Sequence, residues 1–204
     1  VANSVDYPFK YIPNTDATIT TNIKANPATG FSVATYTGTG ANATVGHGLG
    51  VAPKMVIVKC RNAGPTNWMV YQASQNASPA SGNLYLSTTN AFTTDATAWN
   101  NTQPTSSLFT IGTHVWVNGN TNTYVAYCFS DVAGYQKIGS YTGNGSTTGP
   151  VVTTGFRPRF VLMKRSDSNG DWRILDTARD PSLSSHVLYP NDAGAEYTGQ
   201  DYLK

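Results

Sequence analysis

The stretch that decides the fold is Tyr36–Lys59, YTGTGANATVGHGLGVAPKMVIVK, which recurs at Tyr141–Lys164 as YTGNGSTTGPVVTTGFRPRFVLMK. The offset is constant, because 141 − 36 = 105 and 164 − 59 = 105. Eight of the 24 aligned positions are identical, whereas average composition would give roughly one or two matches by chance. We interpret the recurrence as a duplicated structural unit, about the length of one small β domain.

The residues that recur are those that shape turns and strand starts. Each unit carries a glycine where the chain breaks and a proline that opens the next apolar strand, where it costs no ladder hydrogen bond. After a loop that is one residue shorter, a tryptophan recurs at an offset of 104. We predict that the two tryptophans are buried equivalently in the core, with sugar-stacking platforms as the alternative. The expected equivalent residues are Tyr36, Gly50, Pro53 and Trp68 in the first unit and Tyr141, Gly155, Pro158 and Trp172 in the second.

The composition predicts an all-β protein. Only 12% of the residues are charged, against roughly a quarter in an average soluble domain. Glu196 is the one glutamate, while Thr, Val, Tyr and turn residues are abundant, and this balance favours strands over helices. The net charge of +2 is too small to indicate a nucleic-acid partner or an anionic membrane.

Short apolar segments separated by Gly, Asn and Pro turns predict antiparallel β-sandwich modules, with a barrel as the alternative. We expect an extended N-terminal arm over 1–29, a first unit over 30–133 and a related, C-terminally truncated unit over 134–204. The predicted strands are Ala17–Ile23, Phe31–Tyr36, Asn42–His47, Met55–Val58, Trp68–Tyr71, Leu84–Leu86, Leu108–Ile111, Val115–Val117 and Tyr124–Phe129, followed by Gln136–Tyr141, Val151–Thr153, Phe160–Met163 and Trp172–Leu175.

The second unit has no counterpart for the last three strands of the first. Such a unit would leave apolar surface and a sheet edge open, which proteins avoid. We expect the gap to be covered by the arm at 1–29 of the same chain or of a neighbouring copy, by an adjacent subunit, or by further chain. Contact with neighbouring copies is the favoured alternative, and a homo-oligomer or other virion proteins are therefore the expected partners.

No motif indicates catalysis or a cofactor, and we predict neither. The three histidines are scattered, so each is expected to be a surface or turn residue. Asp167, Asn169 and Asp171 place oxygens at alternate positions as a calcium loop does, but the distal bidentate acid is missing, which favours a solvated turn without metal. Cys60 and Cys128 each end an apolar run and are expected to be buried free thiols, with a disulfide as the alternative.

The 75 residues from 62 to 136 contain no Lys or Arg, and their only charges are Asp95 and Asp131. This stretch therefore offers no trypsin site. A surface of this kind is typical of a protein built for durability outside a cell.

The segments GFSVATYTGTGANATVGHGLGVAPKMVIVK, NWMVY and TYVAYCFSDVAGYQKIGSYTGNG resemble a β module of phage virion proteins, common in tail fibres and other structural proteins of marine and cyanobacterial phages and often found in tandem. The similarity covers most of residues 30–176. Its motifs are turn and strand signatures, so the resemblance implies architecture and a virion or extracellular setting, and it brings no catalytic residues.

These observations predict a non-enzymatic phage virion structural protein, part of a tail fibre, an appendage or a surface layer. The alternative is a carbohydrate-binding host-adhesion module that binds a host surface glycan through exposed Tyr or Trp and Asn or Asp side chains. A third alternative, a glycan-cleaving enzyme, requires a close pair of carboxylates; ten Asp are present, but no pair is marked by the sequence.

Overall fold

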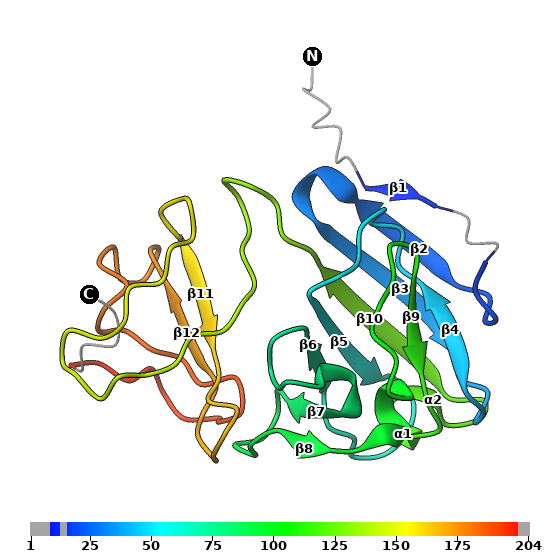
Figure 1. Ribbon diagram of the computed structural model, residues 1–204. Coiled ribbons are helices and arrows are strands. Elements are labelled where there is room, and N and C mark those ends of the chain that lie inside the picture. The colour runs from blue at the N-terminus through cyan, green and yellow to red at the C-terminus, as the bar shows by residue number, and fades with distance from the viewer. Residues whose placement is uncertain (1–8, 13–15, 200–204) are drawn as a thin grey trace.

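The computed structural model describes residues 9–12 and 16–199 of the chain (Figure 1). The described part is built from short strands, with two single-turn α-helices and two 3₁₀ turns, so the all-β prediction is confirmed. The strands are β1 (Lys10–Tyr11), β2 (Asn22–Asn26), β3 (Phe31–Thr37), β4 (Ala43–Gly46), β5 (Met55–Cys60), β6 (Met69–Gln72), β7 (Gly82–Tyr85), β8 (Thr93–Thr94), β9 (Leu108–Ile111), β10 (Thr123–Phe129), β11 (Phe160–Met163) and β12 (Arg173–Asp176). The helices are α1 (Ala96–Trp99) and α2 (Val115–Asn118), and the 3₁₀ turns are Pro27–Thr29 and Pro79–Ser81.

Eight strands form one sheet in the order β1-β2-β3-β10-β5-β6-β7-β8, and every neighbouring pair is antiparallel. The late strand β10 lies between the early strands β3 and β5. Phe129 of β10 stands opposite Phe31 on one side and Met55 on the other. The first unit is therefore complete only when β10 inserts into its middle, about 90 residues after β3 in the chain.

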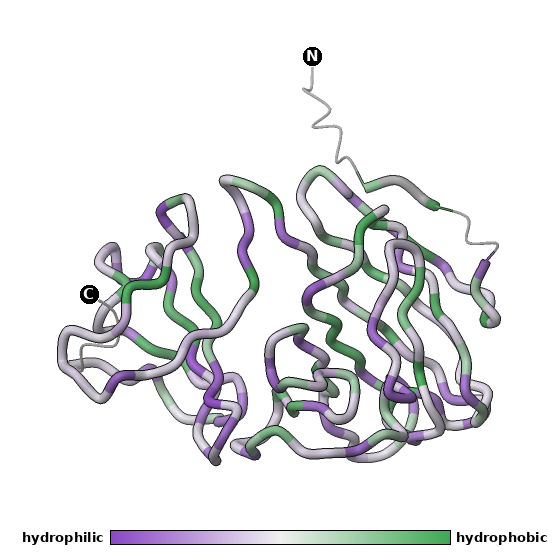
Figure 2. The backbone as a smooth tube through the Cα atoms, in the orientation of Figure 1, coloured by the Kyte–Doolittle hydropathy of each residue, from purple (hydrophilic) through white to green (hydrophobic). Residues whose placement is uncertain are grey.

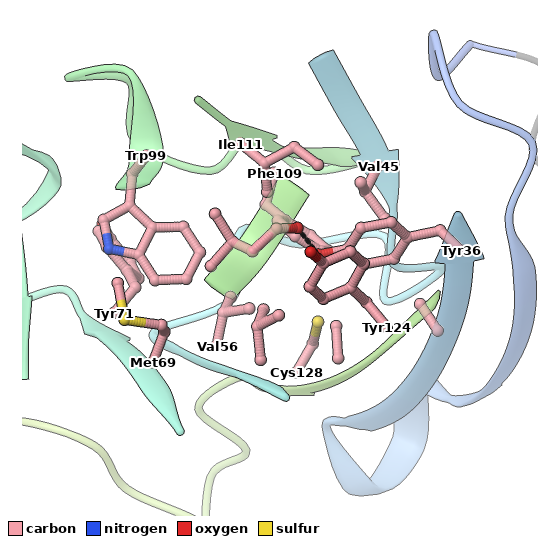
Figure 3. Packing of buried hydrophobic residues seen from close by; sticks show 14 of the residues in the cluster. Tyr36, Val45, Val56, Met69, Tyr71, Trp99, Phe109, Ile111, Tyr124 and Cys128 are labelled. Carbon is pink, nitrogen blue, oxygen red and sulfur yellow. Dashed lines mark hydrogen bonds between the residues drawn. The ribbon is translucent and has the colours of Figure 1, made fainter. Parts of the chain in front are cut away.

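One face of this sheet carries the main core. Burial alternates along β3 and β10, as expected where a strand has one face on a core. The short β4–β9 pair lies over this face and contributes Val45, Phe109 and Ile111 (Figure 3). Figure 2 shows hydrophobic residues along the strands of the large sheet, most continuously at β5.

The opposite face of the sheet packs against the second region, residues 134–199. Ile57, Val70 and Leu84 point to this face and form a second apolar cluster with Trp172. The indole Nε1–H of Trp172 donates a hydrogen bond to the carbonyl oxygen of Tyr85 at 2.7 Å. This tryptophan is therefore one anchor between the two regions, beside the backbone hydrogen bonds from Phe92 N–H to the Ser166 carbonyl oxygen and from Gly170 N–H to the Thr89 carbonyl oxygen, each at 2.8 Å.

The strand pairing of the second region has the register of the first, shifted by 105 or 104 residues. In the first region the opposed pairs are Met55↔Gln72, Val56↔Tyr71, Ile57↔Val70, Val58↔Met69, Val70↔Leu84 and Asn83↔Thr93. In the second they are Phe160↔Asp176, Val161↔Leu175, Leu162↔Ile174, Met163↔Arg173, Ile174↔Leu188 and Val187↔Tyr197. The sequence offset and the pairing offset thus agree from β5 to β8.

Several strand predictions are wrong. Val115–Val117 lies in helix α2, because His114 Nδ1 accepts the backbone N–H of Trp116 at 3.0 Å and caps a helical turn. Residues 136–141 and 151–153 form no strand. For the first of these segments the reason is topological: in the first unit β3 meets β5 only through β10, and the second region has no described strand in the place of β10.

The N-terminal arm also differs from expectation. Its second strand is β2, shifted from the predicted 17–23, and residues 16–19 form bends. β1 pairs with β2 and β2 with β3, at the edge of the large sheet farthest from β11 (Figure 1). The described part of the arm therefore does not cover the second unit of its own chain, as one of the alternatives predicted; residues 1–8 and 13–15 lie outside the described residues.

Candidate functional site

The recurring turn residues have similar backbone conformations in both regions. Gly50 and Gly155 have φ angles of 74° and 84°, in the left-handed region that favours glycine. An added Cβ would meet no heavy atom within 4 Å at either position, so the constraint is the backbone and not space. Pro53 and Pro158 each lie two residues before an apolar strand, β5 and β11. These four residues therefore determine the course of the backbone and supply no reactive or ligand-binding side chain.

The recurring tyrosines have opposite environments. Tyr36 is 5% exposed, stacks on Tyr124 with ring centroids 5.2 Å apart, and donates its hydroxyl hydrogen bond to the carbonyl oxygen of Val117 at 2.7 Å. Tyr141 is 56% exposed, and its hydroxyl lies 3.7 Å from the sulfur of Met163. The partners of Tyr36 belong to residues 108–129, which have no described counterpart in the second region.

The recurring tryptophans also differ, so the prediction of equivalent burial is wrong. Trp172 is buried, whereas Trp68 is only partly buried and stacks on Tyr127 with ring centroids 6.2 Å apart. The Lys59 ammonium lies 5.8 Å from the centre of the Trp68 ring. A neighbouring ring and a side-chain cation therefore already contact Trp68, and the indole is not an open sugar platform. Of the other two tryptophans, Trp99 is buried and Trp116 is partly buried.

Exposed apolar side chains are concentrated in the second region. Seven of the ten large hydrophobic residues that are exposed in the described structure lie there. They are Tyr135, Tyr141, Val151, Val152, Phe160, Leu188 and Tyr197. Surface apolar residues scattered singly are ordinary, but this concentration coincides with the region whose sheet has an open edge. The second region is therefore the candidate assembly surface.

The described residues also form a polar concavity of about 560 Å³ at one end of β2, β3 and β10. Its lining is dominated by threonines, with Asn22 and the exposed Arg61. The threonines are Thr18, Thr20, Thr35, Thr37, Thr39 and Thr123. Hydroxyl groups and one guanidinium suit a polar or anionic ligand, but Tyr36, the one aromatic residue that lines the concavity, is buried. Sequence reasoning missed this site; the alternation of Thr35 and Thr37 on one strand was the available signal.

The three residues with calcium-loop spacing hold no common site. Asp167 pairs with Arg165, with its carboxylate 2.7 Å from the guanidinium Nε. Asn169 Oδ1 accepts the backbone N–H of Ala91 at 3.1 Å, and Asp171 Oδ1 accepts the Asn191 amide at 2.7 Å. Across the described residues, no group of three or more His, Cys, Asp or Glu side chains is placed to hold a metal ion.

The prediction of a surface histidine is wrong for His47. His47 is fully buried, where Nε2 donates to the carbonyl oxygen of Thr105 at 3.1 Å and Nδ1 accepts the backbone N–H of Leu49 at 3.2 Å. Desolvation lowers the pKa of His47 to about 4, so the ring is neutral and cross-links two loops. His114 is only partly exposed and caps α2, with Nε2 3.5 Å from Asp95. Burial lowers the pKa of His114, and Asp95 opposes this shift.

Three carboxylates of the second region, Asp167, Asp176 and Asp180, have lowered pKa values, the opposite of what a glycosidase acid needs. The hydrogen bond from Arg165 lowers the pKa of Asp167, and the hydrogen bond from Arg179 lowers that of Asp176. Asp180 accepts hydrogen bonds from three serines, first of all from the Ser182 hydroxyl, and they lower its pKa as well. A general acid in glycoside hydrolysis needs a raised pKa, so these three carboxylates suit structure and not proton donation.

The two cysteines are buried and free, as predicted. Burial raises the pKa of Cys128 to about 12. The thiol is therefore protonated at neutral pH and unreactive as a nucleophile. Both cysteines contribute packing volume on the main core face.

A family model described as a domain of unknown function, DUF7483, matches residues 8–204. The chain belongs to this family. No curated protein and no solved structure matches it. Within the described ranges, none of the helices has the length and apolar character needed to cross a bilayer.

Proposed function

We propose that the chain is a non-enzymatic structural protein of a phage virion, part of a tail fibre, an appendage or a surface layer, which assembles with other subunits through its second β-sandwich module. The observation that carries the proposal is an edge of β11 that no described strand pairs, in a region that exposes seven large apolar side chains. Open edges and apolar surface are where protein subunits join. The resemblance of residues 30–176 to phage virion modules supports the virion and extracellular setting.

The arrangement of polar groups agrees with a structural role. Each charged pair named above contributes to a helix cap, a turn or a salt bridge. Asp95, for example, caps α1 by accepting the backbone N–H of Thr97 at 2.9 Å. In the second region Arg179 bridges Asp176 and Glu196, with both contacts at 2.6 Å. This network fastens the segment that carries the only glutamate to β12.

The test is association combined with location in the particle. Light scattering on the purified chain should give a mass that rises with concentration, and labelled antibodies should bind intact phage particles. A monomer at all concentrations that binds no apolar dye, with no labelling of particles, would refute the proposal. Turnover of a host polysaccharide that one Asp→Asn change abolishes would refute its non-enzymatic part.

The second candidate function is host adhesion through a glycan. The threonine-lined concavity with Arg61 favours it, because hydroxyls and a guanidinium match the hydroxyl and acidic groups of an anionic saccharide. A glycan array should then show sugar-competed binding that is lost in Arg61→Ala and retained in Arg159→Ala, an exposed arginine outside the concavity. Equal binding by both variants would reject this site.

A further inference from the structure

Among the described residues, no strand pairs with the edge of β11 that faces away from β12. The backbone N–H of Thr177 donates to the carbonyl oxygen of Arg159 at 2.9 Å, which makes this opposed pair a hydrogen-bonded one. Hydrogen-bonding direction alternates along an antiparallel strand, so Val161 and Met163 also direct their N–H and C=O groups to β12. Phe160 and Leu162 direct theirs outward, where no other described strand pairs with β11.

The corresponding edge in the first region is occupied. The bond from Ala73 N–H to the Lys54 carbonyl oxygen, at 2.8 Å, fixes which residues of β5 face β6. Ile57 therefore faces the other way, toward β10, and the bond from Arg61 N–H to the Thr123 carbonyl oxygen at 2.8 Å has the same direction. With the offset of 105, Ile57 corresponds to Leu162. The strand that fills this place in the first region is β10.

The side chains and charges near this edge of β11 indicate what kind of strand would bind to it. In the first region β10 supplies the Tyr124 ring that stacks on Tyr36. Tyr141 corresponds to Tyr36 and lacks such a ring within the described structure, being 56% exposed. The exposed Arg159 precedes β11, at the end where an antiparallel strand would finish. β10 itself is followed by an acidic residue, Asp131.

We infer that the free edge of β11 is a strand-acceptor site that binds an extended segment of another polypeptide with the chemistry of β10. The segment runs antiparallel to β11, alternates small or aromatic side chains on one face, and ends in an acidic residue beside Arg159. Its main-chain groups pair with Phe160 and Leu162, and an aromatic ring covers Tyr141, as in β-strand addition. The inference rests on the proposed assembly function and names its joint.

The experiment adds a peptide to the full chain. The peptide spans residues 121–131 with Cys128→Ser, and a control peptide also carries Val125→Pro, which removes an N–H that would point at β11. Residue-resolved amide exchange should show that the peptide protects Phe160 and Leu162, while Val161 and Met163 are already protected by β12. The control peptide should leave all four amides unchanged.

Two matched variants locate the site. Phe160→Lys places a charge on the edge strand and should weaken peptide binding by about tenfold or more. Val115→Lys is the control, because Val115 is 59% exposed and Phe160 is 58% exposed, but Val115 lies on α2. The control variant should bind the peptide like the unchanged chain.

Two results would overturn the inference. Saturating peptide without protection of Phe160 and Leu162 would show that the edge does not accept a strand. Equal weakening by both variants would place the peptide elsewhere. Protection of Phe160 and Leu162 that rises with protein concentration alone would support the acceptor site and show that a second copy of the chain supplies the segment. If antibodies against the chain label particles and the chain associates while the amides of Phe160 and Leu162 stay unprotected, the proposed acceptor site is wrong and the proposed function stands. If the peptide binds but the chain does not associate and antibodies do not label particles, the proposed function is wrong and the acceptor site stands.

Discussion

Replacing Trp172 tests whether the second region depends on its contact with the large sheet. The side chain is 3% exposed and packs against Ile57, Val70 and Leu84. Removing a buried aromatic ring costs about 3–5 kcal/mol of unfolding free energy. For a domain of roughly 150–250 residues, each kcal/mol shifts Tm by about 2–4 °C, so Trp172→Ala should lower Tm by about 6–20 °C.

Two further variants separate ring packing from hydrogen bonding and from sequence position. Trp172→Phe keeps a ring but removes the indole hydrogen bond to the carbonyl oxygen of Tyr85, which still accepts the backbone N–H of Thr88 at 3.3 Å, so we expect a cost of about 0.5–1.5 kcal/mol. Trp68→Ala removes a ring that is only partly buried, so we expect a cost of about 2 kcal/mol, below the range for full burial. The expected order of destabilisation is Trp172→Ala first and the other two variants below it.

Urea unfolding followed by circular dichroism measures the loss of unfolding free energy, and trypsin cleavage shows which region unfolds first. In Trp172→Ala, Lys164 should become cleavable at a urea concentration at which Lys59 is still protected. The reasoning is refuted if Trp68→Ala destabilises the chain as much as Trp172→Ala does. It is also refuted if Trp172→Phe leaves the unfolding midpoint unchanged, because the hydrogen bond to Tyr85 would then carry no free energy.

Three more measurements test other parts of the structure. His47 has a pKa of about 4 in the folded chain, against 6.5 for an unperturbed ring, so the unfolded chain binds the proton first; stability should fall by up to about 3 kcal/mol as the pH drops from about 6.5 to about 4, and this slope in the urea midpoint should vanish in His47→Gln. Cys60 and Cys128 should not react with a thiol reagent until the chain unfolds, and rapid labelling of the native chain would contradict their burial. Native trypsin digestion should leave a large fragment containing residues 62–136, whereas early cleavage at Lys59 within β5 would show that this strand is not formed.

The sequence was sufficient to predict structure wherever the signal was local. The continuous apolar run at β5 and the alternation along β3 predicted strands that the structure contains. The positive φ angles of Gly50 and Gly155 belong to the same kind of signal, because a turn constrains its own residues. Helix α2 was missed because its apolar residues are β-branched or aromatic and its cap is a histidine ring, which is not among the usual capping residues.

The environments that the sequence did not predict depend on residues distant in the chain. His47 was expected to be a surface or turn residue because no possible metal-ligand partner lies near it in the sequence; Thr105, 58 positions later, supplies the carbonyl oxygen that accepts a hydrogen bond from its ring. The concavity at Arg61 is likewise assembled from four separate segments of the chain. Such sites become visible only when the strand order is known.

Tyr36 and Tyr141 stand 105 positions apart at aligned places in the sequence, but only Tyr36 is buried. The backbone ladder from β5 to β8 recurs in the second region, so local pairing does not require β10. Burial of the tyrosine does require it, because Tyr124 and Val117 are the groups that cover Tyr36. The second region has no described strand in the place of β10; it keeps the backbone pairing of β11 with β12, and its Tyr141 is exposed. The exposure of Tyr141 is therefore explained by the lack of a described strand in the place of β10, and the strand addition proposed above would bury Tyr141 and pair the edge of β11 at the same time.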